Sequence, residues 1–132
     1  MSINDDILKS HDVVIGILSF LPEYTNRISN SSFHIAIYEI KKRNPELFKG
    51  LPFATNASNP YSEDLEQILA TLALCGLLSR NGNWRWNLRG IKNYFNNSLR
   101  KKFIANELEI IDREGKLFAE KVEQGELDPH KS

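Results

Sequence analysis

The first regular pattern in the chain is a helical repeat between positions 5 and 21. Its members recur every three or four residues and are Ile7, Leu8, His11, Val14, Ile15 and Leu18. Asp5 and Asp6 stand in its first turn, where carboxylates stabilise the positive end of the helix dipole. Pro22 cannot continue a helix. The pattern therefore predicts a helix over 5–21.

A second apolar stripe predicts a helix over 33–43, and a pair of serines just before it can cap its N-terminus. The stripe consists of Phe33, Ile37 and Ile40. Asn44-Pro45 indicates one further short turn over 45–49, because proline is favoured at the first helical position. The prolines, asparagines and serine of residues 50–60 predict a loop.

The third pattern joins a helix to a hairpin. Ser62 is placed to cap the helix, and Gly76 is suited to end it in a left-handed conformation. Residues 77–80 and 84–88 then alternate as two short strands, with Asn81-Gly82 between them as a strong signal for a tight turn. Four leucines of this unit are expected in the core: Leu65, Leu69, Leu72 and Leu78.

The last pattern predicts a long helix over 97–124 with a wide apolar face that is interrupted only at Gly115. Its main stripe consists of Ile104, Leu108, Ile111, Phe118 and Val122, with a second stripe of Phe103, Ile110 and Leu117 beside it. The rest of the chain is small, so we expect the main stripe to contact another copy or a partner subunit. This organisation gives a domain over 1–96, an association helix over 97–125 and a flexible tail over 126–132.

Composition is that of an ordinary globular domain, with 132 residues of which 41% are hydrophobic. Seventeen Lys and Arg balance seventeen Asp and Glu, so the net charge does not indicate a partner. The single cysteine, Cys75, excludes an internal disulfide and favours a reducing compartment. The longest apolar run, 13–21, is shorter than the ~20 residues of a membrane span, so we expect a cytoplasmic protein without a membrane contact.

The residues that could carry chemistry do not form a catalytic or metal-binding pattern. The three histidines lack metal-ligand spacing with one another or with Cys75, and they are His11, His34 and His130. His11 and Cys75 are expected to be structural residues of the core or its boundary. The carboxylates of Glu63, Asp64 and Glu66 are explained by their place in the first turn of a helix. We therefore expect no enzyme activity, no cofactor and no metal.

A basic stretch over 80–102 contains no acidic residue. Its cations are Arg80, Arg85, Arg89, Lys92, Arg100, Lys101 and Lys102, and they alternate with the aromatic residues Trp84, Trp86, Tyr94 and Phe95. Such a surface can contact nucleic-acid phosphates. The alternative is that the aromatic residues face inward and the cations are merely solvated. Residues 62–75 carry no Lys or Arg, so DNA contact would come from the basic stretch.

The order of helix, glycine, strand, turn and strand resembles the recognition helix and wing of winged helix-turn-helix domains. The match rests on one motif, Leu65-x3-Leu69-x2-Leu72-x3-Gly76-Leu77-Leu78-x-Arg80. The resemblance covers residues 5–95 and implies a mainly α fold, a winged-helix domain with a short β-hairpin wing and a long C-terminal helix. In most such proteins the third helix enters the major groove. Here the acidic start of that helix argues against a conventional repressor.

Residues 59–66 and 72–80 also resemble the small middle-component proteins of bacterial ABC-three-component (Lamassu-type) defence systems. Membership would imply a winged-helix accessory subunit beside an SMC-like ATPase and an effector. Our main hypothesis is therefore a non-catalytic subunit that docks on partner proteins, with non-specific DNA contact through the basic wing. A dimeric winged-helix transcriptional regulator, paired through its C-terminal helix, is the alternative, and an enzyme is the third class.

Overall fold

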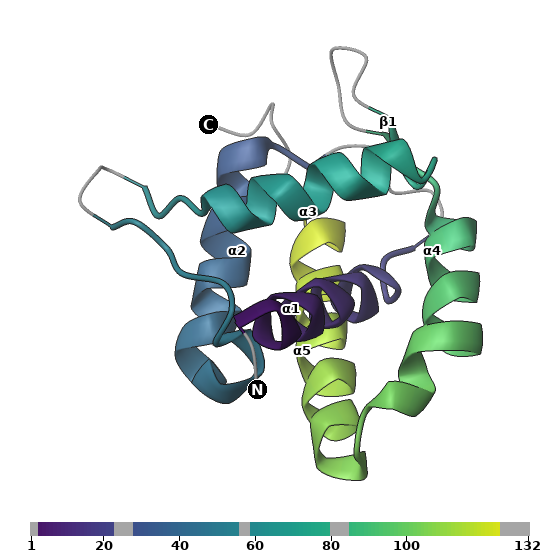
Figure 1. Cartoon of the computed structure of the whole chain (residues 1–132). Coiled ribbons are helices and arrows are strands. Elements are labelled where there is room, and N and C mark those ends of the chain that lie inside the picture. Colours follow the sequence, from purple (N-terminus) through teal and green to yellow (C-terminus); the bar gives the residue numbers. More distant parts are fainter. Residues whose placement is uncertain (1–2, 23–27, 56–58, 80–84, 125–132) are drawn as a thin grey trace.

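The computed structural model describes residues 3–22, 28–55, 59–79 and 85–124, which are mainly helical as expected (Figure 1). The α-helices are α1 (Ile3–Leu18), α2 (Asn30–Arg43), α3 (Glu63–Leu74), α4 (Leu88–Tyr94) and α5 (Ala105–Glu123). The short turns of 3-10 or π type are η1 (Pro45–Phe48), η2 (Phe95–Leu99) and η3 (Arg100–Lys102). The strands are β1 (Leu78–Ser79) and β2 (Arg85–Trp86).

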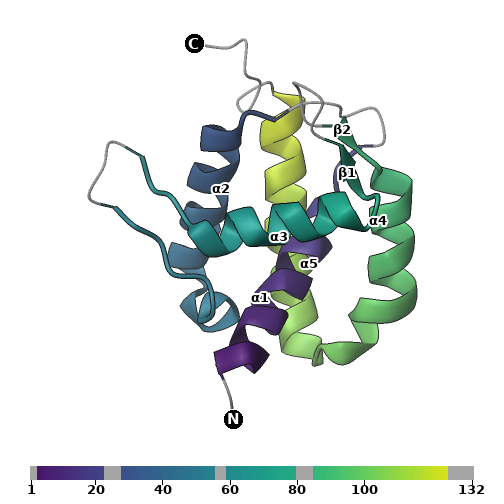
Figure 2. The same cartoon turned by 45° about the horizontal axis from the view of Figure 1, so that its top comes forward.

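Helix α1 lies at the centre of the molecule, and α3, α4, α5, η1 and η2 all pack against it (Figure 2). Every residue over 13–19 is buried, so the apolar run in the sequence is a core helix. Gly16 allows η2 to come close, because a Cβ at this position would lie 2.7 Å from Cε1 of Phe95. The helix ends at Leu18, and the predicted extension to residue 21 is wrong: residues 19–21 form turns instead.

Helix α3 and its cap follow the sequence closely, whereas the cap predicted for α2 at Ser31 or Ser32 is wrong, because both serines lie inside the helix. Helix α2 begins three residues earlier than predicted, because the side chain of Ser29 accepts a hydrogen bond from the N–H of Ser32 at 3.1 Å. Ser62 caps α3 as expected, with its Oγ accepting a hydrogen bond from the N–H of Leu65 at 3.1 Å. Gly76 adopts the expected positive φ of 77°. The predicted core leucines of this unit are confirmed, since all four are buried: Leu65, Leu69, Leu72 and Leu78.

Strands β1 and β2 form an antiparallel pair of two residues each, with Leu78 opposite Trp86 and Ser79 opposite Arg85. The expected turn at Asn81-Gly82 lies outside the described residues, so the wing itself stays a prediction. The returning strand is shorter than predicted. The side chain of Asn87 accepts a hydrogen bond from the N–H of Gly90 at 3.0 Å and starts α4, so Leu88 is helical.

The prediction of one helix over 97–124 is wrong in its first part. Residues 95–102 continue α4 as η2 and η3, so the expected boundary between 96 and 97 falls inside this segment. The chain then becomes extended at Phe103, whose buried ring packs 6.2 Å from that of Phe95. The N–H of Ile104 donates to the Glu107 carboxylate at 3.2 Å, and α5 starts at the next residue. Burial of Phe103 therefore separates two helices.

The expected association stripe on α5 also needs correction. Ile111 and Phe118 are buried in the chain's own core, where the Phe118 ring meets that of Phe33 edge-on at 6.0 Å. Leu108 and Val122 are partly buried against the same core. Ile104 alone of the five predicted interface residues is exposed, at 65%. The main stripe of α5 is thus covered mostly by this chain, chiefly by α1.

A buried carboxylate, Glu114, joins α5 to the end of α2. It is 1% exposed and accepts hydrogen bonds from Nη2 of Arg43 at 2.7 Å and from Nδ2 of Asn44 at 2.8 Å. Burial alone would raise the pKa of Glu114. The hydrogen bonds from Arg43 and Asn44 and the charges of Arg43 and Arg113 outweigh burial and hold the pKa below its ordinary value. The carboxylate is therefore charged in the folded state.

We predict that Leu69→Ala destabilises the fold by about 2–5 kcal/mol, because it removes a fully buried side chain from the core. Leu74→Ala is the matched control on the same helix, since Leu74 is 89% exposed, and it should change stability by no more than about 0.5 kcal/mol. Urea unfolding followed by circular dichroism measures both. Equal losses in the two variants would contradict the assignment of the core.

The charged Glu114 predicts a specific pH dependence. Its folded pKa is lowered, so its contribution is complete above the unfolded pKa and is lost as the pH falls through the folded pKa. Glu114→Gln should cost about 1.5–3 kcal/mol at neutral pH, the range for a hydrogen bond to a charged group. The difference from the unmodified protein should then shrink as the pH falls below the ordinary Glu pKa of about 4.3. Urea unfolding at several pH values tests this, and a difference that does not change with pH would contradict it.

Candidate functional site

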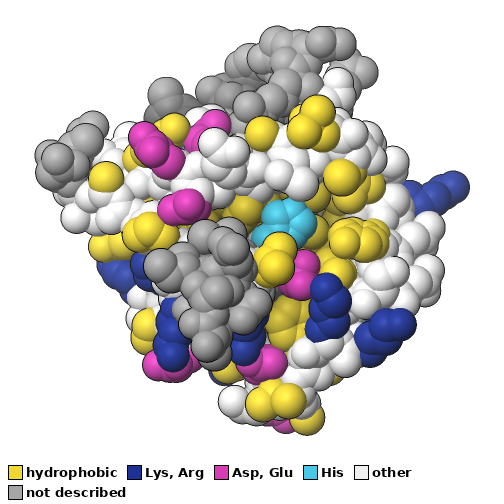
Figure 3. Space-filling model, viewed as in Figure 1, with side chains coloured by type: hydrophobic (Ala, Val, Ile, Leu, Met, Phe, Trp, Pro, Cys, Tyr) yellow, Lys and Arg dark blue, Asp and Glu magenta, His cyan; other side chains and the backbone are white. Residues whose placement is uncertain are grey.

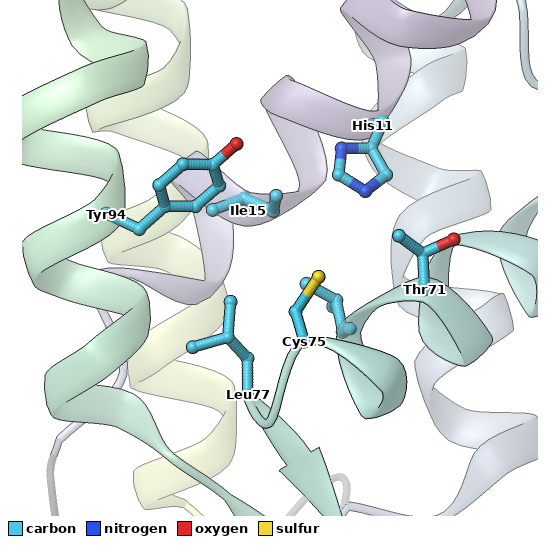
Figure 4. Close-up of a pocket in the computed structure, with 7 residues that line it drawn as sticks. His11, Ile15, Thr71, Cys75, Leu77 and Tyr94 are labelled. Carbon is cyan, nitrogen blue, oxygen red and sulfur yellow. The ribbon is translucent and has the colours of Figure 1, made fainter.

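An apolar groove lies on the face of the molecule between α3 and α4, where hydrophobic side chains gather around a hollow (Figure 3). The larger part of the groove has a volume of about 450 Å³ and is lined by His11, Ile15, Thr71, Leu72, Cys75, Leu77 and Tyr94 (Figure 4). The smaller part has a volume of about 270 Å³ and is lined by Leu8, His11, Asp64, Gln67, Ile68 and Thr71. His11 and Thr71 line both parts, so the two lie next to each other along α3.

Three elements build this groove. Helix α1 forms its floor with Ile15, α3 forms one side, and Tyr94 of α4 stands on the other (Figure 4). The edges remain open to solvent: Leu8 is 60% exposed and Tyr94 is 41% exposed. Exposed apolar side chains at the rim of an apolar hollow are typical of a surface that binds another molecule.

Few polar atoms face this surface. Nδ1 of His11 lies 3.5 Å from Oδ1 of Asp12, while its Nε2 is buried without a hydrogen-bond partner in the described structure. A proton on Nδ1 is favoured by the neighbouring carboxylate, which leaves Nε2 of the neutral ring as an acceptor. The expectation of a buried Cys75 is wrong. Cys75 follows the last residue of α3 as its C-cap and is exposed beside the groove.

His34 is buried, and both nitrogens of its ring are engaged. Its Nδ1 accepts a hydrogen bond from the N–H of Ser62 at 3.1 Å, so its Nε2 carries the proton that points to Oε2 of Glu66 at 2.7 Å. Tyr61 stacks on the ring with a centroid distance of 4.8 Å. This arrangement ties α2 to the start of α3. The acidic residue Glu66 therefore has a structural partner that the sequence pattern did not reveal.

The described part of the chain offers no metal site, since no three His, Cys, Asp or Glu side chains lie close enough together to hold an ion. Nor does any helix in the described ranges have the length and apolar composition needed to cross a membrane. The groove presents apolar surface with isolated polar atoms. Such a surface is suited to binding the apolar side chains of another molecule.

The structure brings much of the basic stretch onto one helical segment, 88–102. Arg89 and Lys101 are exposed on it, together with the uncharged polar residues Asn93, Asn96, Asn97 and Ser98. This outward surface carries no acid. Of the interleaved aromatic residues, Tyr94 is exposed and Phe95 is buried. Arg80 and Trp84 lie outside the described residues, and so do the side chains of Arg85 and Trp86.

Cations of the same segment also contact other parts of this chain. Lys92 donates a hydrogen bond from Nζ to the carbonyl oxygen of Ser19, at the end of α1. Arg100 pairs with Asp112 at 3.2 Å, and Lys102 pairs with Asp12 at 3.5 Å. Both ion pairs involve partly exposed cations, and pairs of this kind contribute little to stability. Arg100 and Lys102 could exchange these partners for phosphates at small cost, whereas Lys92 has a structural role.

Compared with protein-family models, curated proteins and solved structures, the chain shows no match. The geometry of its own residues therefore carries the functional argument.

Proposed function

We propose that the chain is a non-catalytic winged-helix accessory subunit that docks on partner proteins in the cytoplasm. The observation that carries this proposal is the apolar groove beside α1, which the described residues leave open. A concave and mostly apolar surface with few polar groups is typical of a binding site. The resemblance of residues 59–66 and 72–80 to middle components of defence systems adds an SMC-like ATPase as the first partner to test.

A second contact, with DNA, is favoured by the outward surface of 88–102. Arginine, lysine, asparagine and serine side chains all donate hydrogen bonds to phosphate oxygens, and this surface carries them without an acid. Helix α3 offers no comparable surface, because its exposed positions are acidic or uncharged: Glu63, Gln67, Ala70, Thr71 and Leu74. We therefore assign DNA contact to the wing and to the segment that follows it.

The alternative, a regulator that dimerises through its C-terminal helix, loses its main support. It required the stripe on α5 to face a second copy, yet Ile111 and Phe118 pack inside the domain. The exposed residues Ile104 and Leu117 leave a much smaller apolar surface there. The groove differs from that surface because it is hollowed, with its lining built from α1, α3 and α4.

We predict that Thr71→Arg disrupts docking, because Thr71 is an exposed residue of α3 that lines both parts of the groove. Ala70→Arg is the matched control: it places the same side chain at the neighbouring exposed position, outside the groove lining. The chain is to be co-expressed with the products of adjacent genes and purified. A partner should co-elute with the unmodified chain and with Ala70→Arg, and be lost with Thr71→Arg. Equal retention by both variants would place docking elsewhere.

We predict that duplex DNA binds with little sequence preference and with strong salt dependence. Each phosphate neutralised should contribute about −0.9 to the slope of log affinity against log salt. Arg85→Glu combined with Arg89→Glu should weaken binding and flatten that slope. Reversal of Lys42 and Lys116, exposed on α2 and α5, changes the net charge equally and should have a smaller effect. Glu63→Ala should not weaken binding.

Titration of a labelled duplex at several salt concentrations measures both affinity and slope. Absence of binding at low salt would remove the DNA contact and leave protein docking alone. Equal weakening by the two double reversals would show that the effect comes from net charge and not from this surface.

A further inference from the structure

The groove has a definite length and a direction. Along α3 it extends from Asp64 to Cys75, eleven positions that span about 16 Å at the helical rise. Its side is straight because α3 is an unbroken helix from Glu63 to Leu74, with Cys75 as its C-cap. Helix α1 closes it from below with His11 and Ile15. The groove is thus a straight apolar channel, and its length matches about three turns of a docked helix.

The two ends of the channel differ chemically. Asp64 lines one end, and the structure records no ion pair of this carboxylate with any described residue. Residues 62–75 contain no Lys or Arg that could neutralise it from its own helix. The other end is closed by the apolar side chains of Leu77 and Tyr94. A ligand that fills the channel must therefore be apolar along its length and positive at one end.

An extended peptide fits this surface less well than a helix. Peptides that bind as strands need a long free sheet edge, but β1 and β2 have two residues each. A helix brings its own backbone hydrogen bonds and needs only an apolar groove for its side chains. The channel between α1, α3 and α4 supplies this.

We propose that the groove binds an amphipathic helix of a partner protein, with apolar residues at positions i, i+4 and i+7. A Lys or Arg at one end of that helix pairs with Asp64. This proposal rests on the docking function proposed above and specifies the chemistry of the segment that docks.

The test uses a displayed library of helix-forming 16-residue peptides, selected against the full chain. Selected peptides should carry the apolar repeat together with a basic residue at one end. Their affinity, measured by fluorescence anisotropy, should fall at least tenfold for Thr71→Arg and remain within about twofold for Ala70→Arg. Thr71 lines the channel and Ala70 does not.

Charge reversal at Asp64 tests whether the basic end of the bound helix lies beside this carboxylate. Asp64→Lys should weaken a selected peptide at least tenfold, and replacing the terminal base of that peptide with Glu should restore its affinity. Glu63→Lys is the control, because it makes the same charge change in the same helical turn but outside the channel lining. The proposed orientation is supported if the peptide with a terminal Glu regains affinity for the Asp64→Lys variant but not for the Glu63→Lys variant.

Three results would overturn this proposal: selected peptides without a basic end, binders that Thr71→Arg does not affect, or no binder from the library. Each leaves the docking function separately testable. If a co-purified partner is still lost with Thr71→Arg, the groove docks a surface of different chemistry. If that partner is retained, the docking function fails as well.

Discussion

Burial of helix α1 is the constraint on which the rest of the structure depends. Its residues over 13–19 are apolar on nearly every side, so the other elements must surround it. Helices α4 and α5 and the turns η1 and η2 cover most of it, and Gly16 lets the Phe95 ring approach its backbone. Helix α3 covers the first half less completely, and Leu8 remains exposed there. The groove is this uncovered part of the central helix.

Much of the local structure could be predicted because it depends on neighbours in the sequence. Ser62 caps α3 and Gly76 ends it, and the spacing of Leu65, Leu69 and Leu72 identifies the buried face. Each of these signals acts within one or two helical turns. The break at Phe103 was missed because it arises from a contact with the buried Phe95 ring and not from a helix-breaking residue.

The candidate site could not be predicted in the same way. Periodicity shows that a helix has an apolar face, but it does not show what covers that face. The stripe on α5 was therefore assigned to a partner although α1 covers it. Cys75 was expected to be buried although it is exposed at the groove, whereas His11 lies at the boundary of the core as expected. Glu114 accepts hydrogen bonds from Arg43 and Asn44, which lie about seventy positions away from it in the sequence. No local pattern connects such residues.

The central claim is that a partner covers the groove, and the single cysteine of the chain reports on it directly. Cys75 lines the groove and is exposed, so its thiol should react with a thiol-specific reagent at the rate of an accessible cysteine in the free protein. Labelling can be followed by absorbance in the free chain and in the purified complex with its docking partner. The account predicts at least a tenfold slower reaction in the complex. An unchanged rate would mean that the partner binds elsewhere and that the groove is not the docking surface.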